Sequence, residues 1–162
     1  MLPEINKILY ATDLKEKGSK NAFRFAVSLA MSNNAKIVML HVMDELNSSF
    51  DAILRNSMSE RNLNEIKARG IENHQAELQK RLQEFCAEEC PGNEKSYPGG
   101  EPITVVKQGE PYNVILSTAK EYKVDLIVMG TRTHTGVGQV ILGSTANKVI
   151  HQSKVPVLVY PL

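Results

Sequence analysis

The sequence of 162 residues contains no tryptophan, few aromatic residues and two cysteines, Cys86 and Cys90. The cysteines lie four residues apart in a segment with helical periodicity, where a disulfide between adjacent turns is geometrically poor. A zinc site would need more ligands nearby, and His74 is three helical turns away. We therefore expect two reduced, partly buried thiols, with redox sensing as the open alternative.

Long apolar runs and a strong net charge are also missing. No run approaches the roughly 20 residues that span a bilayer, and the net charge of +1 gives no overall attraction to nucleic acid or to an anionic membrane. The opening Met1-Leu2-Pro3-Glu4 lacks the basic and apolar regions of a signal peptide. The hydrophobic fraction of 42% and the charged fraction of 23% are typical of a soluble globular protein. We expect one domain over residues 1–162, located in the cytoplasm, without nucleic-acid or membrane partners.

Three common nucleotide signatures are absent as well. The sequence has no G-x-x-x-x-G-K-[ST], which excludes a P-loop enzyme, and no G-x-G-x-x-G after the first expected strand, which disfavours a dinucleotide site. A glycine-serine loop, which adenylating enzymes of a related architecture need, does not follow that strand either.

What is present is a regular alternation of short apolar runs and helical patterns. Nearly continuous apolar runs indicate strands buried on both faces, as in a parallel sheet. Pro156 cannot donate a ladder hydrogen bond, so the last strand should start there or lie at an edge. Residues 45–60 are the least readable part. The strands are expected at 7–11, 36–44, 103–106, 126–129 and 155–160, and the helices at 19–33, 61–89, 112–122 and from 144 onwards.

This order predicts an α/β fold, an open parallel five-stranded sheet of Rossmann-like type with helices on both faces. Ligands in such sheets sit at the carboxyl ends of the strands, where the winding direction reverses. Thr12-Asp13, Val42 and the loop after Met129 should therefore meet on one rim. His41, between apolar residues of a strand, and His74, on the apolar stripe of the long helix, are expected to be packing residues.

The stretch from Val124 to His151 carries the strongest functional signal. After the strand at 126–129 comes a glycine- and threonine-rich loop at 130–138, and Gly143-Ser144-Thr145 then leads into a helical pattern. The N–H groups of a first helical turn point outward and favour an anion, and Ser144 suits the N-cap position. The pattern fits either a phosphate site or an ordinary capped connection.

With these residues in view, the whole chain resembles the universal stress protein family, in the branch that binds ATP. The resemblance rests most on Tyr10-Ala11-Thr12-Asp13, on His41-Val42, on residues 130–145 and on the terminal strand. The family's phosphate motif is a glycine, two residues, a second glycine, nine residues, then glycine and serine or threonine. Gly130, Thr133 and Gly143-Ser144 keep this spacing, but Thr133 replaces the second glycine. A β-branched threonine resists positive φ and close backbone approach, and the family includes members that do not bind ATP.

The resemblance implies an adenine nucleotide alpha hydrolase-like fold and a placement for ATP. Asp13 would accept a hydrogen bond from the adenine amine or the ribose, or would cap the following loop instead. The Val42 backbone would read the adenine edge, or Val42 would belong only to the core. Arg132 and His134 would screen phosphate charge or face solvent. Magnesium would accompany the phosphates, without a dedicated carboxylate cluster. The implied nucleotide-binding residues are Ala11, Thr12, Asp13, Val42, Met129, Gly130, Arg132, Thr133, Gly143, Ser144, Thr145 and Ala146.

No catalytic constellation is apparent. Ser144, His151 and Asp125 supply the residue types of a hydrolase triad, but Ser144 and His151 would lie two turns apart on one helix. We expect at most slow ATP hydrolysis, with nucleotide occupancy serving as the signal. The alternative is a non-nucleotide member that acts as a dimeric interaction or scaffold module. In either case the resemblance implies a homodimer formed through residues 155–160.

Overall fold

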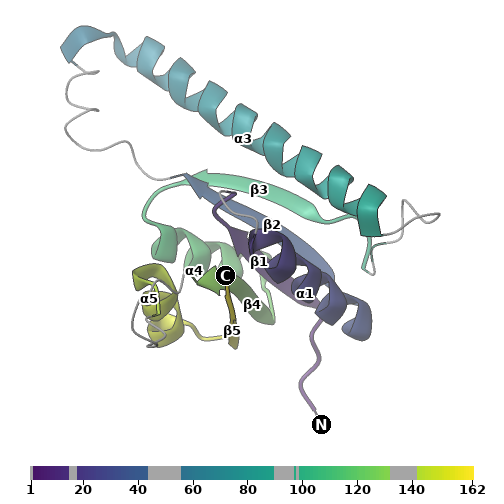
Figure 1. The fold of residues 1–162 in the computed structure, drawn as a ribbon. Helices are drawn as coiled ribbons and strands as arrows, with labels where there is room; N and C mark the ends of the chain where they lie inside the picture. Colours follow the sequence, from purple (N-terminus) through teal and green to yellow (C-terminus); the bar gives the residue numbers. More distant parts are fainter. Residues whose placement is uncertain (1, 15–17, 44–55, 90–96, 98, 132–141) are drawn as a thin grey trace, which may run out of the picture.

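The computed structural model describes residues 2–14, 18–43, 56–89, 97, 99–131 and 142–162. Strands and helices alternate along these residues, as Figure 1 shows. The elements are β1 (Lys7–Thr12), α1 (Gly18–Asn33), β2 (Lys36–Met43), α3 (Glu60–Glu89), β3 (Ile103–Gln108), α4 (Pro111–Tyr122), β4 (Leu126–Thr131), α5 (Ser144–Gln152) and β5 (Val157–Pro161).

The five strands form one parallel sheet in the order β3-β2-β1-β4-β5. In the central strand β1, Ile8 is paired with Ile37 of β2 on one side and with Leu126 of β4 on the other. The chain thus winds outward from β1 in one direction, through β2 to β3, and then returns to wind in the other direction through β4 to β5. The expected parallel α/β fold is confirmed, and the reversal of winding lies between β1 and β4.

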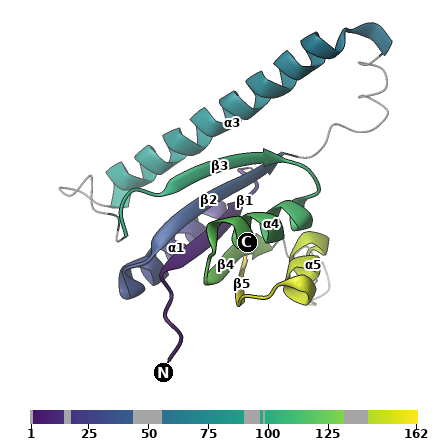
Figure 2. The same ribbon diagram turned by 180° about the vertical axis from the view of Figure 1, so that it is seen from behind.

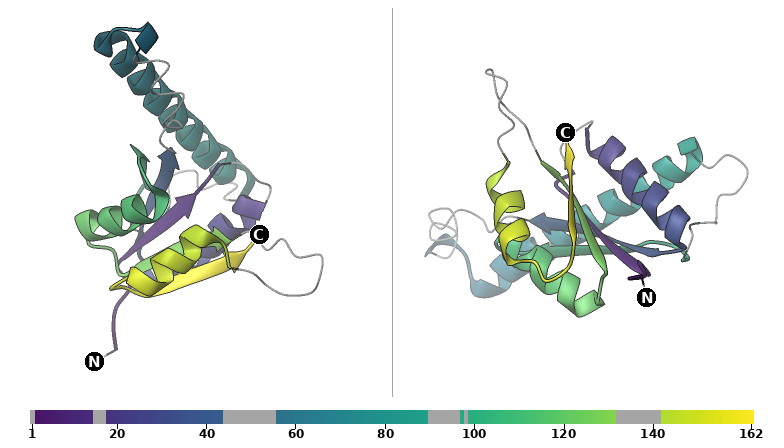
Figure 3. Two further views of the ribbon diagram at one scale, coloured as in Figure 1. Left: turned by 90° about the vertical axis from the view of Figure 1, so that its left-hand side faces the viewer. Right: turned by 90° about the horizontal axis from the view of Figure 1, so that it is seen from below.

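Helices cover both faces of the sheet. One buried cluster joins α1 residues such as Phe23, and Leu78 of α3, to Tyr10 in β1. A second cluster on the opposite face joins Ile115 of α4 and Val149 of α5 to the sheet. Figures 2 and 3 show α4 and α5 together on one side and α1 and α3 on the other. Because strand residues alternate between faces, the continuous apolar runs of β1, β2 and β4 supply both clusters.

Helix α3 is much longer than the sheet is wide, and its N-terminal part extends beyond the strands (Figure 1). Its attachment to the sheet combines the fully buried Leu78 with polar contacts to the edge strand β3. The Gln75 side-chain amide donates to the Thr104 backbone oxygen over 3.0 Å, and the Thr104 hydroxyl donates to Gln79 Oε1 over 3.3 Å. The expected long amphipathic helix at 61–89 is confirmed. Cys90, the Cys86 side chain and residues 45–55 lie outside the described parts.

Several element boundaries differ from the sequence-based expectation. Gly130 and Thr131 were expected in a loop but belong to β4, because β5 continues alongside them and pairs Tyr160 with Gly130. The Leu162 N–H then donates to the Thr131 carbonyl over 2.9 Å. Strand β5 begins at Val157, directly after Pro156, and lies at the edge of the sheet, as the missing proline N–H requires.

Candidate functional site

A cavity of about 560 Å³ opens at the carboxyl ends of β1, β2 and β4. Its position coincides with the reversal of winding, where parallel α/β sheets leave a crevice outside the strand ends. Both faces of the sheet contribute to its wall, which α4 and the start of α5 extend on one side and α3 on the other. The lining residues are Tyr10, Ala11, Thr12, Asp13, Ser19, Leu40, His41, Val42, Met43, His74, Pro111, Ile115, Met129, Gly130, Thr131, Gly143, Ser144, Thr145, Ala146 and Leu162.

Most of the residues proposed from the sequence meet at this cavity, although they come from three strands and a helix start. Arg132 and Thr133 lie outside the described residues, and so does His134. Contact with a nucleotide remains a prediction for all of them. Those that line the cavity are Ala11, Thr12, Asp13, Val42, Met129, Gly130, Gly143, Ser144, Thr145 and Ala146.

The first turn of α5 forms one end of the cavity. Gly143 is the N-cap residue and Ser144 the first helical residue, so the expected N-cap role of Ser144 is wrong. Among the described residues no side chain caps this helix start. The Gly143 N–H donates to the Thr131 hydroxyl over 3.0 Å. The N–H groups that follow remain the candidate anion donors of this end.

Gly130 allows the chain end to pack against β4. A β-carbon at this position would lie 2.7–2.9 Å from the side-chain carbons of Leu162, which is closer than real contacts allow. Leu162 in turn lines the cavity. The glycine therefore shapes the cavity wall through Leu162, a role that the spacing of the phosphate motif does not indicate.

Two histidines meet on the opposite side of the cavity. The imidazole of His41 in β2 stacks on that of His74 in α3, with ring centroids 4.9 Å apart and planes 9° from parallel. His41 Nδ1 lies 2.9 Å from the Thr12 carbonyl oxygen, and His74 Nδ1 lies 2.8 Å from the Gly70 carbonyl oxygen. Both rings contact other groups of the fold, as expected for packing histidines, but both also line the cavity.

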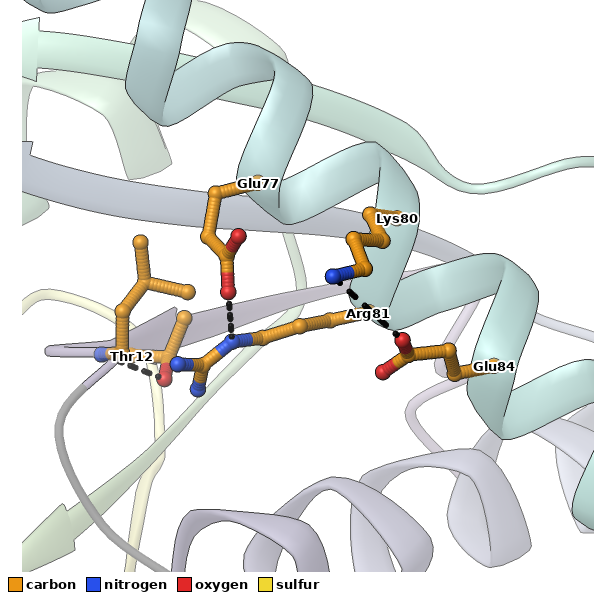
Figure 4. A network of polar contacts seen from close by, with 6 residues as sticks. Thr12, Glu77, Lys80, Arg81 and Glu84 are labelled. Atoms are coloured by element: carbon orange, nitrogen blue, oxygen red, sulfur yellow. Dashed lines mark hydrogen bonds and ion pairs between the residues drawn. The ribbon is translucent and has the colours of Figure 1, made fainter.

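Charged side chains of α3 extend over the end of β1. Figure 4 shows the Arg81 guanidinium reaching toward Thr12 while its Nε lies 2.9 Å from Glu77 Oε1. The hydrogen bond from Arg81 lowers the pKa of the Glu77 carboxyl. Burial raises the pKa of the Tyr10 phenol to about 12; Asp13 adds to the rise, whereas Thr12 and Arg81 oppose it. The Tyr10 hydroxyl donates to the Ser19 carbonyl over 2.8 Å.

The cavity also contains residues that sequence reasoning did not assign to it, notably Tyr10, Thr131, His74 and Leu162. Tyr10 and Thr131 could have been found, since each is adjacent to a predicted site residue at a strand end. His74 and Leu162 reach the cavity only through the packing of α3 and the course of the chain after β5. No local pattern indicates either of them.

The residues considered for a triad do not form one. Asp125 Oδ2 accepts from the Asn6 and Lys7 backbone N–H groups at 2.8 and 2.9 Å, which gives Asp125 a structural role at the start of β1. Within the described residues, no three histidine, cysteine or acidic side chains cluster as a metal site. None of the described helices combines the length and apolar character that crossing a membrane requires.

Comparison with known proteins identifies the family. Residues 4–161 match the Universal stress protein family. The Bacillus subtilis universal stress protein YxiE is 33% identical over 159 residues, covering 95% of this chain and 97% of its own. The Lactobacillus plantarum universal stress protein UspA superposes with a TM-score of 0.67 at 24% identity, covering 98% of this chain and 99% of its own. A universal stress protein in complex with cAMP superposes with a TM-score of 0.50 at 20% identity, each chain covered to 98%. Because the family model matches nearly the whole chain and the fold agrees with that of known members, the chain belongs to the universal stress protein family.

Proposed function

We propose that this protein is an ATP-binding stress-response regulator whose nucleotide occupancy is the signal. The observation that carries the proposal is the convergence of Asp13, Val42 and the first turn of α5 on one cavity. A carboxylate, an exposed strand end and a helix N-terminus supply an acceptor, backbone groups and an anion site. An adenine nucleotide needs this combination, and a cavity of about 560 Å³ is of the size that small ligands occupy.

The phosphate end of the site is α5. Its start has no side-chain cap among the described residues, so its first-turn N–H groups suit an anionic ligand. Ser144 and Thr145 add hydroxyl groups at the same place, and Ala146 is small and buried. The ribose would lie near Met129 and Gly130, which line the same cavity.

The base end of the site is formed by Asp13 and Val42. Asp13 would accept a hydrogen bond from the adenine amine or from the ribose, and the Val42 backbone would read the base edge. The complex of a related universal stress protein with cAMP supports an adenine nucleotide as the ligand class. Magnesium would be held mainly by the phosphates, because the described residues offer no cluster of carboxylates for it.

We propose that ATP hydrolysis is slow at most. Asp125, the carboxylate that the sequence offered for a triad, is bonded to the backbone at the start of β1 and does not line the cavity. We further propose that residues 1–162 form a single domain and that the protein works in the cytoplasm. We also propose that it forms a homodimer through the terminal strand.

The test is calorimetric titration with ATP and magnesium of the wild type, Ser144→Glu and Ser144→Gln. Ser144 is exposed in the first turn of α5, where the helix dipole stabilises a negative side chain. The fold should therefore tolerate both changes. A carboxylate there repels phosphate, whereas the amide of similar size does not. We expect Ser144→Glu to weaken ATP binding about tenfold or more, and Ser144→Gln to change it only about two- to threefold.

Equal affinities of the two variants would place the phosphates away from α5. Absence of binding by the wild type, with no nucleotide co-purified, would overturn the proposal. It would favour the alternative of an interaction or scaffold module with its loop rebuilt around Thr133.

A further inference from the structure

The stacked histidines lie at the opposite side of the cavity from α5. His41 is on β2 and His74 on α3, which packs over β2 and β3, whereas α5 begins beside the end of β4. Strands β2 and β4 flank β1, so about 10 Å of sheet separates them at the usual strand spacing. A nucleotide whose phosphates lie at α5 therefore directs its base toward the histidines.

The hydrogen bonds of the two rings determine their tautomers. A backbone carbonyl only accepts hydrogen bonds, so each Nδ1 that faces one must carry a proton. His41 Nδ1 faces the Thr12 carbonyl and His74 Nδ1 faces the Gly70 carbonyl. In a neutral imidazole protonated at Nδ1, the other nitrogen, Nε2, has a lone pair and can only accept.

We propose that His74 Nε2 is a specificity-determining acceptor that makes the cavity prefer bases with an exocyclic amino group over bases with a carbonyl at the same position. The inference rests on the proposed nucleotide function and names the selectivity of that site. An amino group donates to Nε2, whereas a carbonyl oxygen would face its lone pair without a proton between them. A site that hydrogen-bonds one group rejects the analogue lacking it, because its own polar atom is left unpaired.

Two contacts hold the His74 ring in place for this role. The bond to Gly70 fixes it along α3, and the nearly parallel stack on buried His41 fixes its plane. His41 is itself held by Thr12 at the end of β1. The acceptor is therefore oriented before any ligand arrives, which keeps the ordering cost of binding low.

Charged groups around the pair come from several elements. Glu77 and Arg81 lie beside His74 on α3, and Asp13 lines the same cavity after β1. The lowered pKa of Glu77 and the raised pKa of Tyr10 keep the Glu77 carboxylate charged and the Tyr10 phenol neutral at pH 7.5. On β3 the neighbour of His41 in register is the apolar Val106.

The experiment compares ATP with inosine triphosphate, which has a carbonyl in place of the adenine amino group. Wild type, His74→Phe and His74→Gln are titrated by calorimetry at pH 7.5. Phenylalanine keeps a ring to stack on His41 but has no acceptor, and glutamine restores an amide oxygen. We expect the ATP preference to fall about three- to tenfold in His74→Phe, the range of one net hydrogen bond, and to be partly restored in His74→Gln. Thermal unfolding verifies that each variant is folded.

The outcomes separate this inference from the function on which it rests. A wild type that binds both nucleotides equally, or a His74→Phe variant with the wild-type ratio, overturns the role of His74 and leaves nucleotide binding standing. A wild type that binds neither ligand overturns both.

Discussion

Tyr10 carries a buried phenol in the central strand, and this burial makes the free energy of unfolding depend on pH above about 10. Its pKa is about 12 in the folded protein, against about 10 in an unfolded chain. The neutral phenol therefore stabilises the fold fully below pH 10, and this contribution is lost as the pH rises toward 12.

We predict that the wild type loses about 2 kcal/mol of unfolding free energy between pH 10 and 12 relative to Tyr10→Phe. The variant lacks the bond to the Ser19 carbonyl, so it starts from a different stability, but it also lacks the titrating group. Urea unfolding, followed by circular dichroism across this pH range, gives the pH dependence of the unfolding free energy for both proteins. Parallel pH profiles would contradict the assignment.

Sequence reasoning found the site residues that lie at the carboxyl ends of strands. Asp13 and Val42 were predicted to meet because parallel strands end on one rim, and they do line one cavity. Thr131 was assigned to a loop because the apolar run ends at Met129 and a glycine- and threonine-rich stretch follows. The pairing of β5 that extends β4 past Gly130 is a long-range contact, which local propensity does not contain. For the same reason the Gly143 bond to Thr131 was not foreseen.

The two parts of helix α3 differ in burial. Leu78 is fully buried against the sheet, whereas Ile66, three turns earlier, is 44% exposed. Both are large apolar residues of one helix, so its periodicity alone does not show which part is attached.

We predict that Leu78→Ala destabilises the protein by about 2–5 kcal/mol, through lost burial and the cavity it leaves. Ile66→Ala in the same helix should change stability by less than about 0.5–1 kcal/mol, because little burial is lost. Chemical denaturation of both variants measures the difference. Equal effects would mean that the N-terminal part of α3 is buried in solution, for example against another molecule.

The sequence predicted the type and order of each strand and helix in the described residues, because several independent sequence signals agreed. Continuous apolar runs, helical periodicity and turn residues all favoured the same alternating pattern. The strand order follows from contacts between distant segments and could be read only from the structure. The attachment of α3 by Gln75 to Thr104 is likewise invisible to periodicity, since glutamine is an ordinary surface residue.

At the level of the whole molecule, the edge strand β5 is the surface proposed to form the homodimer. β5 pairs with β4 on one side, and its Tyr160 lies 5.9 Å from the Phe25 ring of α1, which is itself 41% exposed. An edge strand with apolar side chains is a natural place for a second copy to pair.

We predict a mass of twice a single chain in sedimentation equilibrium, and a shift toward monomer in Tyr160→Lys, because a charge on an edge strand opposes pairing. Met31→Lys, at an exposed position of α1, is the control and should remain dimeric. A wild type that sediments as a monomer at micromolar concentration would contradict the proposed dimer.

The Asp125 carboxylate, bonded to backbone N–H groups 118 and 119 residues earlier, has a consequence for how the chain acquires its structure. The central strand β1 pairs with β2 early in the chain, but its other partner, β4, comes near the end. During synthesis the backbone N–H and C=O groups on one edge of β1 stay unpaired until β4 has left the ribosome. Folding should therefore be slow, as for other sheets dominated by distant pairings. The nascent chain is most open to aggregation during the interval between β2 and β4.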